Sequence, residues 1–95
     1  MDLAKKIRDE LLAGNYVISD HAEDMLRERG VELWQIEAGV SQWKMVEIRP
    51  GDLPNPSIVV SQLLADGTEV TVVWSWYDAL EAVNLVMVHY LDDDT

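Results

Sequence analysis

The stretch SDHAEDMLRERGV, residues 19–31, contains both the start and the end of one short helix. Ser19 can accept a hydrogen bond from the free N–H groups of the first helical turn. Gly30 can adopt the left-handed conformation that ends a helix. His21 is therefore expected at the helix start and Arg29 in its last turn.

Further elements are predicted on both sides of this helix. A first helix is expected over residues 3–12, where apolar side chains recur every four residues and Asp2 can cap the start. A third helical stretch is expected over about residues 32–40. Residues 16–18 are expected to be a short extended link between the first two helices.

The second half of the chain changes from helical to alternating periodicity, which predicts strands. Residues 49–56 contain all three prolines and are expected to form a loop. Asp66-Gly67 is a tight-turn signal typical of an antiparallel hairpin. The predicted strands cover about residues 43–49, 57–64, 69–77 and 83–91. The fold class is therefore α+β, with two or three N-terminal helices packed on one antiparallel sheet of about four strands.

Alternation also separates the faces of the last two predicted strands. In residues 69–77, the face expected to be core consists of Val70, Val72, Trp74 and Trp76. The other face is mixed enough to line a cleft and consists of Thr71, Val73, Ser75 and Tyr77. The last strand is apolar on both sides, which is typical of a central strand. There, His89 is placed on one face with Leu85 and Met87, as a core histidine.

Composition predicts a single domain over residues 1–95 with a short acidic tail at 92–95. The chain has 95 residues, is 48% hydrophobic and contains no cysteine. No apolar stretch approaches the roughly 20 residues that span a bilayer, so a cytoplasmic protein without membrane contact is expected. Neither histidine has a partner at a recognised ligand spacing, so no metal and no cofactor are expected.

Charge bears on the kind of partner. The formal net charge is −11, and all seven basic residues precede Pro50. Nucleic-acid affinity depends mostly on neutralising phosphates, so RNA binding is disfavoured. A protein partner is favoured. The four tryptophans also make a homodimer plausible, because tryptophan is enriched at interface hot spots.

Several residues carry a resemblance to a known family. They are Ser19, His21, Ala22, Arg29, Gly30, the Asp66-Gly67 turn and Tyr90. With two helices followed by a sheet, the chain resembles the domain-of-unknown-function 4258 family. That family resembles small bacterial toxin nucleases of the RelE and barnase-EndoU-colicin type, which cleave RNA without a metal.

The resemblance implies three catalytic residues. His21 would be the base, Arg29 the cation that stabilises the phosphorane and Tyr90 the acid, with His89 as the alternative acid. At two other polar positions of the family's pattern the chain departs from it, with Met25-Leu26 after the histidine and Thr71 after the turn.

Three functions stay open on these grounds. The first is a protein-interaction module with a nuclease-like fold and a partly lost active-site pattern. The second is a metal-independent, toxin-like endoribonuclease that uses His21, Arg29 and Tyr90. The third is an acidic mimic of nucleic acid, which requires the carboxylates to form rows on one face.

Overall fold

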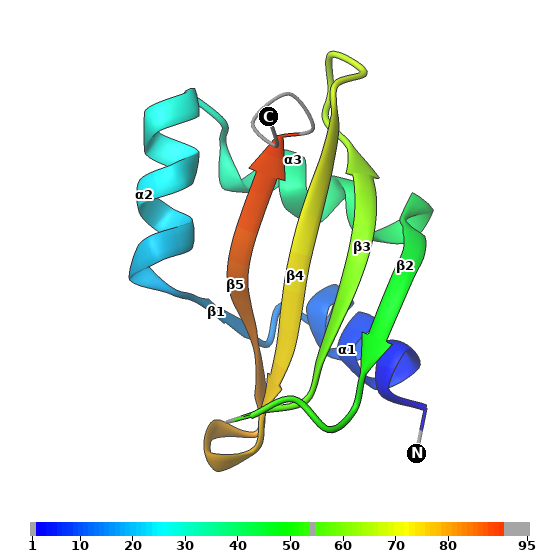
Figure 1. The fold of residues 1–95 in the computed structure, drawn as a ribbon. Coiled ribbons are helices and arrows are strands. Elements are labelled where there is room, and N and C mark those ends of the chain that lie inside the picture. The colour runs from blue at the N-terminus through cyan, green and yellow to red at the C-terminus, as the bar shows by residue number, and fades with distance from the viewer. Residues whose placement is uncertain (1, 54, 91–95) are drawn as a thin grey trace.

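The computed structural model describes residues 2–53 and 55–90 of the 95-residue chain. The α+β class predicted from the sequence is confirmed (Figure 1). The predicted acidic tail at 92–95 lies outside the described residues. In chain order the elements are α1 (Leu3–Leu12), β1 (Tyr16–Ile18), α2 (Asp20–Arg29), α3 (Leu33–Ala38), η1 (Gly39–Gln42), β2 (Lys44–Arg49), β3 (Ser57–Leu63), β4 (Glu69–Tyr77), η2 (Asp78–Leu80) and β5 (Ala82–Tyr90).

The described sheet has five strands in the order β1-β5-β4-β3-β2, one more than expected. The strands β2 to β5 form an antiparallel meander, which accounts for the four antiparallel strands predicted. β1 is the segment expected to be a link, and it pairs in parallel with β5, with Tyr16 beside Val83. Three residues are too few to show an alternating pattern, and their partner strand is far away in sequence. The sheet is therefore mixed, and β5 has neighbours on both sides.

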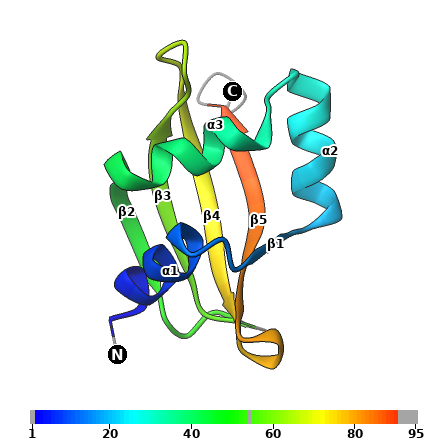
Figure 2. The ribbon, with the colours of Figure 1, turned by 180° about the vertical axis from the view of Figure 1, so that it is seen from behind.

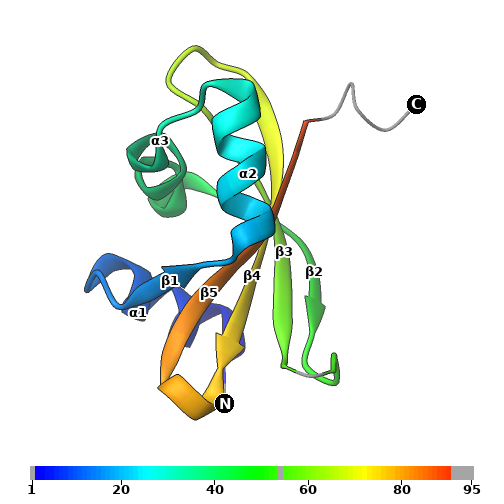
Figure 3. The ribbon, with the colours of Figure 1, turned by 90° about the vertical axis from the view of Figure 1, so that its left-hand side faces the viewer.

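The helices leave one face of the sheet uncovered. α1 and α3 cross the same face, whereas α2 lies at the edge of the sheet beside β5 (Figures 2 and 3). α1 begins where the Asp2 carboxylate accepts a hydrogen bond from the Lys5 backbone N–H at 3.1 Å. Its predicted stripe of Leu3, Ile7 and Leu11 is buried. The face toward the viewer in Figure 1 carries no helix, and we call it the open face.

The covered face contains a buried polar link between helix and sheet. Gln62 on β3 donates from Nε2 to the carbonyl oxygen of Ile36 at 2.7 Å. Its Oε1 accepts a hydrogen bond from Nε1 of Trp74 at 3.0 Å. At Gly39, a Cβ atom would lie 2.8 Å from Gln62 Nε2, so the absence of a side chain lets η1 approach β3. The predicted core face of β4 is confirmed, because Val70, Val72, Trp74 and Trp76 are all buried.

A bulge in β5 changes which of its side chains share a face. Val73 pairs with Met87 but Trp74 pairs with Leu85, so Val86 has no partner on β4. The extra residue reverses the alternation. Leu85 faces the core, whereas Met87 and the half-buried His89 lie on the open face, opposite Val73 and Thr71. The predictions that Leu85 shares a side with Met87 and that His89 is a core residue were therefore wrong.

Candidate functional site

Ser19 fixes the start of α2 against the sheet. Its Oγ accepts a hydrogen bond from the Ala22 N–H at 3.0 Å, as the sequence predicted. The same hydroxyl donates to the carbonyl oxygen of Val86 at 3.0 Å, and the Ser19 N–H donates to that of Leu85 at 3.0 Å. The helix start is thus attached to the β5 bulge. Gly30 ends the helix in the left-handed region, with φ at 67°.

The three predicted catalytic residues do not converge. His21 is exposed at the start of α2 and has no hydrogen bond or ion pair among the described residues. Arg29 lies eight residues further along the helix, which places its Cα about 12 Å away. Its guanidinium stacks 4.6 Å from the centre of the Tyr90 ring. The structure brings Arg29 and Tyr90 together but leaves His21 at the other end of α2.

A base must lie within about 3 Å of the proton that it abstracts, or act through one water. His21 is too far from the Arg29–Tyr90 contact for one phosphate group to bridge them directly. His89 follows Met87 on the open face, whereas Tyr90 packs against the core cluster on the covered side. Neither histidine therefore completes a three-group site at Tyr90.

The open face carries a concave site that the resemblance did not indicate. A cavity of about 420 Å³ lies where Asp52, Leu53 and Asn55 approach the ends of β3, β4 and β5. We call it the open-face groove. Its described lining combines apolar side chains, neutral polar ones, one arginine and one aspartate. The main members are Val73, Val86, Met87, Ser75, Tyr77, Asn84, Ser57, Arg49 and Asp52.

Polar contacts hold one rim of this groove in place. The Ser57 hydroxyl donates to the Asp52 carboxylate at 2.6 Å, which ties the 50–56 loop to β3. Arg49 pairs with Glu47 at 2.9 Å, and this pairing raises the pKa of the Arg49 guanidinium further. The floor has no histidine or cysteine. The groove can thus bind an apolar group with hydrogen bonds around it.

One signal in the sequence did point to this groove. The second face of β4 was predicted to be mixed enough to line a cleft, and Val73, Ser75 and Tyr77 do line it. The residues contributed by other strands, such as Asn84, were missed. They meet only because β3, β4 and β5 are paired in this register, and the bulge turns Met87 toward them.

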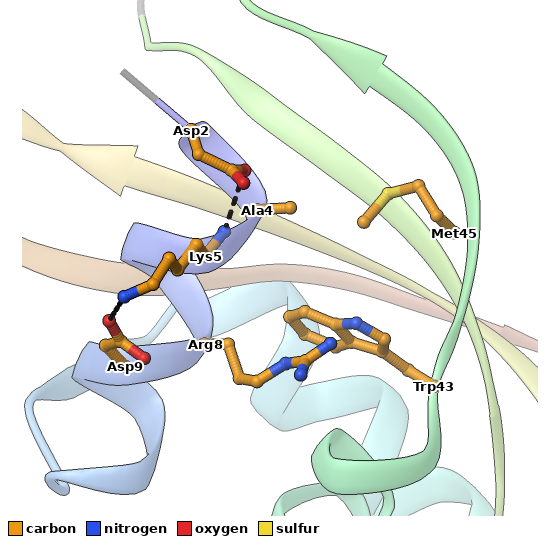
Figure 4. A pocket seen from close by; sticks show the side chains of 7 residues that line it. All are labelled: Asp2, Ala4, Lys5, Arg8, Asp9, Trp43 and Met45. Carbon is orange, nitrogen blue, oxygen red and sulfur yellow. Dashed lines mark hydrogen bonds and ion pairs between the residues drawn. The ribbon is translucent and has the colours of Figure 1, made fainter.

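Further hollows lie around α1, and two of them include tryptophan side chains. One of about 490 Å³ separates α1 from β2, and there the Arg8 guanidinium lies 5.5 Å from the centre of the Trp43 ring (Figure 4). Lys5 pairs with Asp9 at 2.8 Å along its rim. The other hollow exposes an apolar patch in which Leu12 is 64% and Trp34 is 58% accessible. Trp34 is thus the most exposed tryptophan, Trp43 is half-buried, and Trp74 and Trp76 are buried.

Among the described residues, Tyr16 has the largest pKa shift, and its hydroxyl makes a contact between two elements of the fold. Burial, followed by a hydrogen bond from the Tyr16 hydroxyl to Glu37 Oε2 at 2.8 Å, raises the pKa of Tyr16 to about 12. This contact joins β1 to α3. The Tyr16 ring also meets Trp74 edge-on, with centroids 6.3 Å apart. The neutral phenol therefore supports the packing of the covered face.

Comparisons with known proteins found no relative of this chain. No protein-family model, curated protein or solved structure matches the chain. Within residues 2–53 and 55–90, no group of three or more acidic, histidine or cysteine side chains is placed to hold a metal ion. No helix in the same part of the chain is long and apolar enough to cross a membrane.

Proposed function

We propose that this chain is a protein-interaction module whose binding site is the open-face groove. The observation that carries the proposal is an uncovered, concave sheet face with the apolar floor Val73, Val86 and Met87. Concave sites with an apolar floor and a few convergent polar groups are typical of binding sites. The separation of His21 from the Arg29–Tyr90 contact argues against a nuclease centre.

The charges predict the chemistry of the partner. Acidic side chains stand at the same end of the sheet as the groove: Asp52 lines it, and Asp78 begins η2 directly after β4. The chain has a net charge of −11. We therefore expect a segment that inserts an apolar side chain into the groove and places lysine or arginine near these carboxylates, which also steers association.

A displayed library of random peptides tests this site whatever the sequence of the partner is. We expect the wild-type protein to enrich peptides with an apolar residue flanked by basic ones. Met87→Lys introduces a charge on the groove floor and should abolish their binding. Leu63→Lys is the matched control, because Leu63 is 59% exposed at the far end of β3 and should leave binding unchanged.

Two outcomes would contradict the proposal. One is enrichment of peptides that Met87→Lys still binds but Trp34→Ala does not, which would move the site to the Leu12–Trp34 patch. The other is that the wild-type protein enriches no peptide with an apolar residue flanked by basic ones more strongly than the Met87→Lys protein does. Circular dichroism of each variant checks that the fold is intact.

A ribonuclease is the second candidate, and the contact between Arg29 and Tyr90 favours it. RNA cleavage in EDTA, on free RNA and on translating ribosomes, separates the two functions. The interaction module predicts no cleavage by the wild type. Cleavage that is lost in His21→Ala and Tyr90→Phe, with both variants folded, would establish the nuclease instead.

A further inference from the structure

β2 is a free sheet edge with exposed apolar side chains. It is the last strand in the order β1-β5-β4-β3-β2, and all six of its residues are exposed. Met45, Val46 and Ile48 are 39%, 61% and 49% accessible. An edge strand presents unpaired N–H and C=O groups, and an apolar edge is a template for pairing with another chain. The opposite edge, β1, has only three residues.

Charge identifies this edge as the place where two copies can meet. Together, α1 and β2 hold five basic and three acidic residues, a net charge of +2. The rest of the chain holds two basic and fifteen acidic residues, a net charge of −13. Two copies that met through the acidic remainder would oppose strongly like-charged regions, whereas contact through α1 and β2 opposes only +2 to +2. Contact through β2 keeps the acidic regions apart and screened by solvent.

The charge order within β2 is complementary to itself. Glu47 and Arg49 are two residues apart, so both side chains lie on the same face, and their charged groups are 2.9 Å apart. In an antiparallel pair with Ile48 opposite Ile48 of a second copy, Glu47 of each chain lies opposite Arg49 of the other. Opposite charges and apolar pairs directly across two strands stabilise a sheet. The bulge between Met45 and Glu47 precedes these residues and leaves their pairing regular.

We propose that two copies of this chain associate through antiparallel pairing of their β2 strands, with Ile48 at the two-fold axis. The two sheets then continue as one, and their open faces lie on the same side of it. Such an interface is isologous, because the same strand is used by both copies. It uses the outer edge of β2 and shares only Arg49 with the open-face groove, so loss of the dimer in Ile48→Lys leaves the proposed function standing.

The hollow between α1 and β2 fits this arrangement. Trp43 and Met45 extend into it from β2 and the residue before it, and Ala4 and Arg8 face them from α1 (Figure 4). It runs beside the outer edge of β2, which pairs with no other described strand. With Ile48 opposite Ile48, Met45 of one copy lies beside residues 50–52 of the other, which would border the hollow on its outer side.

The first experiment measures the oligomeric state by sedimentation equilibrium over a range of protein concentrations. We expect a monomer–dimer equilibrium for the wild type and a monomer for Ile48→Lys. Leu80→Lys is the matched control, because Leu80 is 60% exposed in η2, away from β2, and should leave the dimer unchanged. A wild-type monomer at every concentration would overturn the proposal, as would a dimer unaffected by Ile48→Lys.

A cysteine placed at the axis tests the register directly. The natural chain has no cysteine, so Ile48→Cys provides a single thiol. Residues directly opposite each other in an antiparallel pair are close enough for a disulfide. We expect Ile48→Cys to form a disulfide-linked dimer under mild oxidation, and Leu80→Cys to stay a monomer on denaturing gels. Equal cross-linking of the two variants would contradict the register.

Exchanging the charges of Glu47 and Arg49 distinguishes self-association through β2 from the binding of a different partner. Glu47→Arg places two arginines opposite each other and should weaken the dimer. Adding Arg49→Glu in the same chain restores opposite charges across the axis and should restore it. A double variant that dimerises no better than Glu47→Arg would refute self-pairing in this register.

Discussion

The covered and the open face of the sheet are built from the same strands but differ in what their side chains do. On β4, Trp74 and Trp76 face the helices and are buried, with the Trp74 indole hydrogen-bonded to Gln62. On the other face of the same strand, Val73, Ser75 and Tyr77 line a groove. Stability is therefore concentrated on one side of the sheet. The other side carries the groove that we propose as the binding site.

The largest effect should come from deleting the central side chain of the covered face. Trp74→Ala removes a ring that is 1% exposed and leaves Gln62 Oε1 without its indole donor. We expect a loss of about 3–5 kcal/mol in the free energy of unfolding. Tyr77→Ala, on the open face of the same strand, should cost far less. Urea denaturation measures both, and similar losses would break the distinction between the faces.

Gly39 tests how closely the helical layer approaches the sheet. A Cβ at this position would lie 2.8 Å from Gln62 Nε2 and 3.3 Å from the backbone oxygen of Leu63. We expect Gly39→Ala to destabilise the protein by about 1–3 kcal/mol through overpacking. Gly51→Ala is the control, because nothing lies within 4 Å of its Cβ position. Thermal denaturation should show a lower midpoint for the first variant alone.

The start of α2 offers a smaller test. Ser19→Ala removes the cap of the helix and the hydrogen bond to Val86, so we expect a loss of about 1 kcal/mol. His21→Ala removes an exposed side chain and should change stability by less than about 0.5 kcal/mol. Denaturant titrations compare the two. A larger loss for His21→Ala would show that the histidine, and not the serine, positions the helix.

The smallest effect concerns alkaline pH and the covered face. The pKa of Tyr16 is about 12 in the folded protein, above the ordinary tyrosine value of 10.0. Folding therefore favours the neutral phenol, and this stabilisation is complete below pH 10 and is lost as the pH rises through about 12. Because the ring is only partly buried, solvent screening keeps the effect small.

Stability curves measured across this pH range should fall more steeply for the wild type than for Tyr16→Phe, which cannot ionise at this position. Tyrosinate absorbance measured in parallel reports the ionisation itself. Parallel curves for the two proteins would show that Tyr16 titrates alike in the folded and unfolded states.

Local signals in the sequence predicted most of the fold. The Asp2 and Ser19 caps, Gly30 and the Asp66-Gly67 turn each act within a few residues, so the sequence contains all that is needed to see them. β1 could not be predicted in this way, because three residues become a strand only through pairing with β5.

The difference between local signals and contacts between distant strands also explains how much of the candidate site could be predicted. The mixed face of β4 was visible as an alternation, but the groove also needs Asn84, Met87 and the 50–56 loop, which come together only in the folded sheet. The β5 bulge adds one unpaired residue, Val86, and nothing in the apolar run around it marks the position. Arg29 and Tyr90 meet, but His21 does not join them, because one helix holds His21 and Arg29 at opposite ends.

The parallel pairing of β1 has a consequence for how the chain folds during synthesis. β1 and the start of α2 emerge from the ribosome early, yet the strand that pairs with them, β5, is the last described one to emerge. Contacts between distant parts of a chain are slow to form because the intervening loop must close first. The N-terminal segments must therefore wait, with their apolar side chains unprotected, until the sheet receives the strand next to β1.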